Sequence, residues 1–216
     1  MAGHRAAMIA TIEAHARVLE RVFGRDGLSP RVLEAMRQVP RHRFAPKAAA
    51  ASAYDDRPIR IGAQQTISQP FIVAAMTHLI DPQSTDRVLE VGTGSGYQAA
   101  VLSPLVAQVY TIEVAPGLAA QAAARLSELG YANVETRSGD GYAGWPKAAP
   151  FDAILVTAGA DDIPPPLLDQ LKPGGRMVIP LGWGFDQDLS LVTKADSGEV
   201  TCERLFPVSF VRFART

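Results

Sequence analysis

Three glycines stand at every second position, Gly92, Gly94 and Gly96, directly after an apolar run. Because glycine has no Cβ and tolerates a positive φ, a backbone with this spacing can lie directly against a ligand. Glu113 follows about twenty positions later, at the end of a second apolar run, where a carboxylate can take the ribose hydroxyls of a nucleotide-type cofactor. A glycine loop alone is a weak signal, but this layout predicts a nucleotide-type cofactor site.

Two further acidic residues narrow the choice of cofactor. Glu90 stands two residues before the first glycine, where a carboxylate would repel a pyrophosphate at short range. It suits a positively charged cofactor such as S-adenosylmethionine, and the alternative is a solvated residue at a strand end. Asp140, between Gly139 and Gly141, can receive an adenine amino group, but taken alone it is equally typical of a plain turn. The order of these acids along the chain favours S-adenosylmethionine.

The elements that would position these residues alternate along the chain. Strands alternating with helices predict a parallel sheet covered on both faces, with the ligand at the carboxyl ends of the strands. We therefore expect an α/β fold with a doubly wound, mostly parallel sheet and helices on both faces. The predicted strands are Arg87–Val91, Val109–Glu113, Val134–Ser138, Phe151–Thr157 and Met177–Leu181, and the predicted helices are Gly96–Leu105, Pro116–Leu129 and Pro165–Leu171.

Both ends of the chain have a different pattern from this core. The first forty or so residues have helical periodicity, including a helix over Arg31–Val39 that begins after Ser29-Pro30. The stretch Thr66–Pro70 is interpreted as the start of another helix. Near the other end, Leu189–Lys194 and Val200–Phe206 predict an antiparallel hairpin. We expect an N-terminal helical cover and C-terminal antiparallel strands.

Composition limits the possible partners. The chain has 216 residues and a formal net charge of -1, which indicates one domain and no polyanion partner. A local basic group, Arg37 to Lys47, is better explained by a solvated helix end than by nucleic acid. One cysteine, Cys202, and four histidines without ligand spacing argue against a disulfide and a metal site. With no signal-peptide pattern and no membrane-spanning run, we expect a cytoplasmic monomer with no membrane or nucleic-acid partner.

Several stretches outside the glycine loop resemble the protein-L-isoaspartate O-methyltransferase family, within the class I S-adenosylmethionine-dependent methyltransferases. The stretch Gln65–Pro70 resembles a signature specific to that family. Segments 29–46, 139–146, 150–158 and 171–180 are also similar, so the resemblance runs from about residue 29 to 211. It implies a Rossmann-like methyltransferase fold and one domain over 1–216. Its parts would be a helical cover with the substrate loop (1–80), a cofactor-binding core (81–184) and C-terminal strands (185–216).

The resemblance implies a specific reaction. Members of this family transfer a methyl group from S-adenosylmethionine to the α-carboxylate of L-isoaspartyl residues in damaged proteins and peptides, and leave S-adenosylhomocysteine. The ester then closes to a succinimide, whose hydrolysis regenerates some normal aspartate. A carboxylate is already ionised near neutral pH, so no general base is required. The protein must align two reactants and exclude water.

The resemblance also assigns roles to individual residues. Thr66 and Ser68 are implied as catalytic and substrate-binding, since hydroxyls and amides at a helix start are suited to holding a carboxylate. Ser68 would orient the reacting carboxylate, and the alternative for both residues is an ordinary helix cap. Val211 would line the substrate cleft and Gln187 would border the site. The implied cofactor contacts are Gln65, Ile67, Glu90, Gly92, Gly94, Ser95, Gly96, Glu113, Asp140 and Gly141.

Departures from the family pattern concern the substrate more than the cofactor. They leave open a second interpretation, a carboxylate O-methyltransferase with a different peptide substrate. A third, a non-catalytic S-adenosylmethionine-binding protein, is disfavoured because binding and orienting residues occur together. Base methylation is disfavoured because no Asn/Asp-Pro-Pro-Tyr/Phe motif follows the fourth strand. The departures are Arg60 at a common proline position, Gln64 at a common glycine position, Phe71 in place of tyrosine or histidine, and Arg212 and Phe213 near the end.

Overall fold

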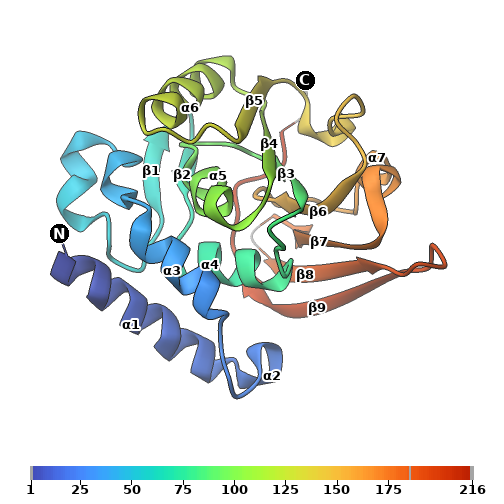
Figure 1. Ribbon diagram of the computed structural model, residues 1–216, viewed down its shortest axis with the longest axis horizontal. Coiled ribbons are helices and arrows are strands. Elements are labelled where there is room, and N and C mark those ends of the chain that lie inside the picture. The colour runs from blue at the N-terminus through green and yellow to red at the C-terminus, as the bar shows by residue number, and fades with distance from the viewer. Residues whose placement is uncertain (1, 185, 215–216) are drawn as a thin grey trace.

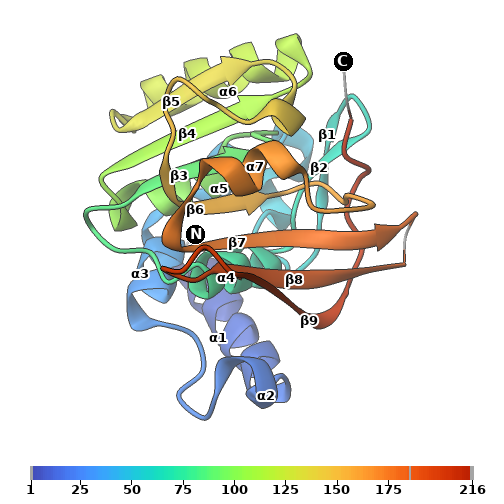
Figure 2. The same cartoon turned by 90° about the vertical axis from the view of Figure 1, so that its right-hand side faces the viewer.

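The computed structural model describes residues 2–184 and 186–214, and its centre is a seven-stranded sheet (Figures 1 and 2). The strand order is β5-β4-β3-β6-β7-β8-β9. The pairs from β5 to β7 are parallel, whereas β8 and β9 continue the sheet as antiparallel neighbours. This confirms the α/β fold with C-terminal antiparallel strands. The strands are β3 (Arg87–Val91), β4 (Gln108–Glu113), β5 (Val134–Ser138), β6 (Phe151–Val156), β7 (Leu171–Trp183), β8 (Asp186–Lys194) and β9 (Val200–Val208).

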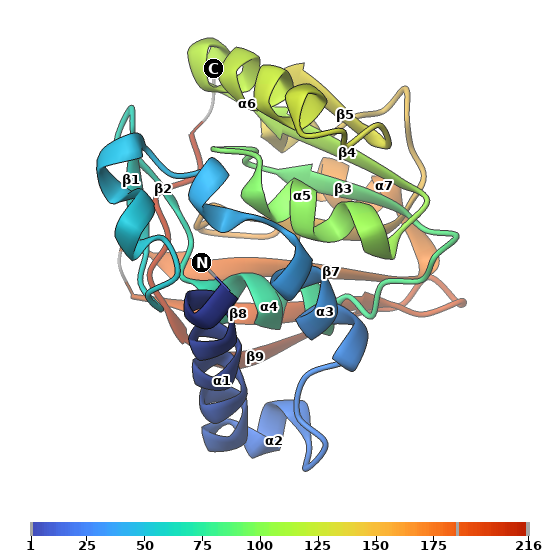
Figure 3. The same cartoon turned by 60° about the vertical axis from the view of Figure 1, so that its left-hand side comes forward.

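Helices cover both faces of the sheet, with α7 on the face opposite to α4 and α5 (Figure 3). Successive strand residues point to opposite faces, so Val88 joins the core under α4 and α5 while Leu89 joins the core under α7. No described helix is long and apolar enough to cross a membrane. The helices are α1 (Ala2–Val18), α2 (Glu20–Phe23), α3 (Pro30–Gln38), α4 (Pro70–Leu79), α5 (Tyr97–Leu102), α6 (Pro116–Glu128) and α7 (Pro165–Gln170), with 3-10 turns η1 (Arg41–Arg43), η2 (Lys47–Ser52), η3 (Ser103–Leu105) and η4 (Gly141–Ala143).

The helix predicted to start within Thr66–Pro70 begins at the last residue of that stretch, and the residues before it are not helical. A separate two-stranded hairpin, β1 (Ile59–Gly62) and β2 (Gln65–Ile67), occupies this stretch, and α4 begins only at Pro70. Thr66 and Ile67 are β-branched and pair with β1, which favours an extended backbone. Proline at the first helical position then sets the start of α4.

The turn of this hairpin is strained. Gly62 pairs with Gln65, so Ala63 and Gln64 form a two-residue turn, with φ angles of 47° and 57°. Positive φ at both turn residues suits the twist of a hairpin, but it costs a non-glycine residue roughly 1–2 kcal/mol. The conformation explains why a glycine is common at the position of Gln64, and shows that this departure leaves the turn geometry in place.

Strand β7 begins earlier than predicted. The expected strand was Met177–Leu181, preceded by turn residues, whereas β7 runs from Leu171 to Trp183. Phe151 pairs with Leu171, and the next pair is Ala153 with Arg176. The residues between them on β7, which include Gly174 and Gly175, therefore form a bulge.

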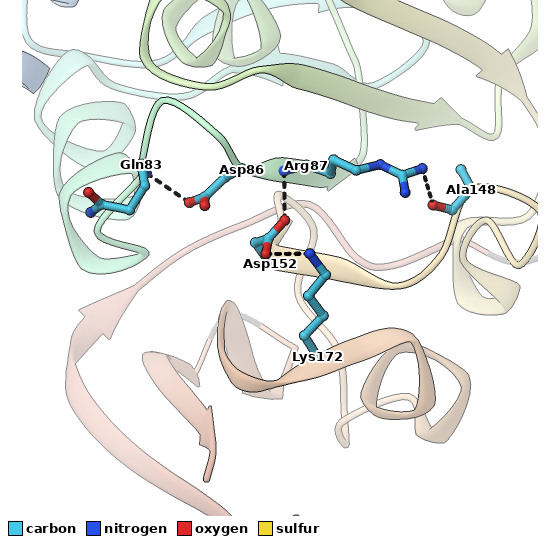
Figure 4. Close-up of polar contacts among 6 residues, drawn as sticks. All are labelled: Gln83, Asp86, Arg87, Ala148, Asp152 and Lys172. Carbon is cyan, nitrogen blue, oxygen red and sulfur yellow. Dashed lines mark hydrogen bonds and ion pairs between the residues drawn. The ribbon is translucent and has the colours of Figure 1, made fainter. Parts of the chain in front are cut away.

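The amino ends of β3, β6 and β7 are joined by one carboxylate (Figure 4). Asp152 accepts hydrogen bonds from the backbone N–H of Arg87 at 2.8 Å and from Lys172 Nζ at 2.6 Å. Asp86 accepts from the N–H of Gln83 at 2.7 Å, and burial raises the pKa of Asp86. These contacts lie at the edge of the sheet away from the carboxyl ends, so we assign them to stability.

We expect Asp152→Ala to lower the free energy of unfolding by about 2 kcal/mol, because it leaves the Arg87 N–H without its acceptor. Lys172→Ala removes only a partly exposed ion pair, so it should lower the free energy of unfolding by less than about 1 kcal/mol. Urea unfolding of both variants measures the difference. Equal losses of stability in the two variants would contradict this account.

Candidate active site

The carboxyl ends of β3, β4 and β6 meet at a cavity, named here the central cavity. The chain runs from β3 to β4 on one side of this point and from β6 to β7 on the other, and open α/β sheets bind ligands where the strand order reverses in this way. Thr157, just beyond β6, donates from its hydroxyl to the carbonyl oxygen of Gly92 at 2.7 Å and so ties the glycine loop to the sheet. The residues that line the cavity include Gln65, Thr66, Val91, Gly92, Gly94, Glu113, Gly141, Thr157, Arg212 and Phe213.

Two glycines give the central cavity its shape. Gly92 has a φ of 101°, and a Cβ at this position would collide with Thr157 Oγ1. A Cβ on Gly141 would collide with Val91 Cγ1. Larger residues at these positions would therefore displace cavity walls, and the fit to a closely bound ligand depends on glycine.

Glu113 is held rigidly at the cavity wall. Its Oε2 accepts from the N–H of Gly94 at 2.8 Å and its Oε1 from the N–H of Ala115 at 3.0 Å, and the residue is only 4% exposed. A carboxylate has about four acceptor positions, so each oxygen can accept a second hydrogen bond. The arrangement fits a ribose, whose adjacent hydroxyls need two neighbouring acceptors.

Glu90 is fully buried and does not line the central cavity. Its Oε2 accepts from the Thr111 hydroxyl at 2.6 Å, and the hydroxyls of Thr111 and Thr93 are also 2.6 Å apart. Burial raises the pKa of Glu90 to about 8, so the group is protonated near neutral pH. The alternative of a solvated strand-end residue is wrong, and the predicted contact of Glu90 with the cofactor stays a prediction.

The buried carboxyl of Glu90 should make stability pH-dependent. Its folded-state pKa lies above the value in the unfolded chain, so the stability it contributes at low pH is lost as pH rises toward about 8. Compared with Glu90→Gln, we expect the wild type to lose free energy of unfolding between about pH 5 and about pH 8, by at most ~1.4 kcal/mol per pH unit. Urea unfolding of both proteins across this range measures the effect, and parallel pH profiles would contradict it.

The other predicted cofactor contacts divide into two groups. Gln65, Gly92, Gly94, Glu113 and Gly141 line the central cavity. The others do not line it, and their contacts with cofactor stay predictions. They are Ile67 in the core, Ser95 and Gly96 at the start of α5, Glu90 under the loop, and Asp140, which accepts from the N–H of Tyr142 at 2.9 Å and caps η4.

Two further cavities adjoin the central one. The acceptor cavity, of about 440 Å³, is lined by Thr66, Ser68 and the chain after β9 up to Phe210. The outer groove, of about 940 Å³, lies between the β1–β2 hairpin and the C-terminal segment, and Val211 lines it. Thr66 lines all three spaces. A ligand in the central cavity and another in either neighbour would therefore approach each other at Thr66.

The structure excludes the helix-cap alternative for Ser68 and Thr66. Helix α4 has no side-chain cap at Gln69, and its Phe71 N–H donates instead to Asp56 Oδ1 at 2.8 Å. Among the described residues, neither the Ser68 nor the Thr66 hydroxyl has a hydrogen-bond partner. Both hydroxyls therefore have a hydrogen-bond donor to offer to a carboxylate bound here.

Arg41 supports the Ser68 loop from inside the protein. Its Nη2 donates to the Ser68 carbonyl at 2.8 Å, its Nε donates to the Ala53 carbonyl at 2.7 Å, and its guanidinium lies 4.7 Å from the ring of Tyr97. Tyr97 directly follows the glycine loop, so Arg41 connects both halves of the site. The assignment of Arg41 to a solvated helix end is wrong, since the residue is completely buried.

Gln187 anchors the C-terminal segment and lines none of the three cavities described above. Its Oε1 accepts from the Phe210 N–H at 2.8 Å, while its Nε2 donates to the carbonyl oxygens of Phe210 and Gly184. The segment then bridges to the end of β6, where the Gly159 N–H donates to the Val211 carbonyl at 2.8 Å. In the described ranges no three His, Cys, Asp or Glu side chains gather as a metal site.

Comparison with known proteins identifies the family. The family model described as protein-L-isoaspartate(D-aspartate) O-methyltransferase matches residues 15–216. The chain belongs to this family. A protein-L-isoaspartate O-methyltransferase of Nitrosococcus oceani is 56% identical over 211 residues, which cover 98% of this chain and 96% of that protein. One from Opitutus terrae is 56% identical over 206 residues, covering 95% and 88%.

Solved structures of protein-L-isoaspartate O-methyltransferases have the same fold. One matches with a TM-score of 0.82 and 26% identity, covering 97% of this chain and 66% of the other. A second, from Plasmodium falciparum, matches with a TM-score of 0.79 and 22% identity over 99% of both chains, and was solved with S-adenosyl-L-homocysteine. The Rossmann-like methyltransferase fold is thus confirmed.

Proposed function

We propose that this chain methylates the α-carboxylate of L-isoaspartyl residues in damaged proteins and peptides, with S-adenosylmethionine as methyl donor, and so starts their repair through a succinimide. Family membership supports the reaction. The observation that carries the site assignment is that Thr66 borders the central cavity, the acceptor cavity and the outer groove. Donor and acceptor can therefore meet at one place in the fold.

The central cavity fits the nucleoside part of the donor. Gly92 and Gly141 let the cavity walls pack closely, because a Cβ on either would collide with Thr157 or Val91, and Glu113 keeps two acceptor positions for the ribose hydroxyls. When bound, S-adenosylmethionine supplies an electrophilic methyl carbon on its sulfonium. Glu90 is buried beside the loop, and we propose that it contacts the positively charged cofactor, with Ile67, Ser95, Gly96 and Asp140 completing the cofactor site.

The substrate carboxylate needs no general base to activate it. The substrate carboxylate is already ionised near pH 7, so the chain's task is to orient it and keep water away. The Ser68 and Thr66 hydroxyls donate to the carboxylate oxygen that does not react, while Arg41 fixes the Ser68 backbone. One carboxylate oxygen forms the new bond to the methyl carbon as the carbon–sulfur bond breaks, and its electron pair stays on sulfur. No proton moves in this step.

We also propose a monomeric, cytoplasmic protein without nucleic-acid or membrane partners. Near-balanced charge and a single cysteine, Cys202, support this proposal. The chain would work as one methyltransferase domain, in which residues 1–80 supply the substrate loop, 81–184 the cofactor core and 185–216 the C-terminal strands.

The test is methyl transfer from labelled S-adenosylmethionine to two peptides that differ only in L-isoaspartate or normal aspartate. We expect a base-labile methyl ester on the isoaspartyl peptide alone. Cofactor binding, measured in parallel, distinguishes an inactive protein preparation from a wrongly assigned substrate. If the protein binds cofactor but methylates neither peptide, the proposed substrate is wrong and a different carboxylate must be the acceptor.

A further inference from the structure

The outer groove carries two guanidinium groups and, among the described residues that line it, no carboxylate. Arg60 extends from β1 on one side, and Arg212 lies on the C-terminal segment that runs beside the hairpin on the other (Figure 2). The remaining walls are neutral, with Gln64, Gln65 and Val211 among them. Since the whole chain has a net charge of only -1, this positive character is local.

Both arginines have hydrogen-bond donors to offer. Arg60 is exposed and has no ion pair within the described part of the chain. Arg212 places Nη2 3.2 Å from Asp161 and its guanidinium 5.2 Å from the ring of Trp183, and its side chain is 70% exposed. A guanidinium has five N–H donors, so the contact with Asp161 leaves several unused. Asp161 itself does not line the groove.

The groove is continuous with the reaction site. It shares Thr66 and Phe210 with the acceptor cavity, and Thr66, Gln65 and Arg212 with the central cavity. A peptide whose isoaspartyl carboxylate reaches Thr66 and Ser68 can therefore extend its neighbouring residues into the groove. Those neighbours would lie next to two cationic side chains.

We propose that Arg60 and Arg212 form a subsite for an acidic side chain next to the isoaspartyl residue of the substrate. The subsite makes the enzyme favour isoaspartyl peptides with a flanking Asp or Glu over those with a flanking Lys. This inference rests on the proposed methyl transfer. Carboxylate–guanidinium pairs at an exposed rim are weak and screened by salt, so we expect a preference of about tenfold that decreases at high ionic strength.

The experiment uses isoaspartyl peptides of one sequence with Glu, Gln or Lys in the flanking positions. We expect kcat/KM to fall in the order Glu, Gln, Lys, mainly through KM. Arg212→Gln and Arg60→Gln should each reduce the Glu-to-Lys ratio, and Arg60→Glu should shift it toward Lys. The ratio is the readout because Arg212 also lines the central cavity, and a loss of cofactor affinity would lower all three rates alike.

Arg204→Gln is the matched control. Arg204 pairs with Asp188 on the neighbouring strand and lines none of the three cavities, so the variant removes one arginine and should leave the ratio unchanged. Equal kcat/KM for all three peptides with the wild type would overturn the subsite while the methyl transfer stands. Methylation of none of them, with cofactor bound, would overturn both.

Discussion

Glu113→Ala is expected to weaken S-adenosylmethionine binding by about 100-fold or more. The carboxylate is the proposed acceptor for two ribose hydroxyls, and hydrogen bonds to charged groups contribute about 1.5–3 kcal/mol each. The substitution also releases the N–H groups of Gly94 and Ala115, which Glu113 now holds at 2.8 and 3.0 Å. Isothermal titration calorimetry on the purified variant measures the loss.

Glu113→Gln is the control for the size of the side chain. Glutamine fills the same space and keeps one acceptor oxygen, so we expect an intermediate loss of about tenfold. Circular dichroism melting shows whether both variants remain folded. An alanine variant that is folded and binds cofactor within about threefold of the wild type would contradict the assignment of Glu113.

Ser68→Ala is expected to lower kcat for isoaspartyl peptides by about 10- to 100-fold while cofactor affinity stays close to that of the wild type. The variant removes one hydrogen bond to an ionised group that is being aligned for reaction. Ser68 does not line the central cavity, which is why donor binding should be preserved. Steady-state kinetics with saturating S-adenosylmethionine separate the two effects.

Two variants sharpen this prediction. Ser68→Thr retains a hydroxyl and should recover part of the lost rate, whereas Ser197→Ala, in the turn between β8 and β9, should leave the rate unchanged. Full activity of Ser68→Ala would show that its hydroxyl does not orient the carboxylate. A large loss of cofactor affinity in the same variant would instead place Ser68 in the donor site.

Local patterns were sufficient to predict the parallel strands and three residues that line the central cavity, Gly92, Gly94 and Glu113. The buried strands around Val88, Val109 and Ile154 are mostly apolar, and turn residues mark their ends. The glycine loop and Glu113 follow each other at a spacing that one βαβ unit imposes. Their convergence on the central cavity therefore required no knowledge of distant contacts.

Other parts of the site depend on contacts that are remote in sequence. Asp56 caps α4 from 15 residues upstream, and Thr157 ties down Gly92 across 65 residues. In the sequence, nothing distinguishes Arg41 from the exposed arginines beside it. Its burial depends on the fold, which brings the carbonyl oxygens of Ala53 and Ser68 to its guanidinium. The three-residue strand β2 likewise exists because β1 is there to pair with it.

Donor and acceptor are expected to meet at Thr66 and Ser68. The most direct test is a crystal structure of the protein with S-adenosylhomocysteine and an isoaspartyl peptide. We predict the ribose hydroxyls on Glu113, the isoaspartyl α-carboxylate within hydrogen-bond distance of Ser68 Oγ, and the donor sulfur directed at that carboxylate. A peptide carboxylate bound away from Thr66 and Ser68, or a nucleoside outside the central cavity, would contradict the account.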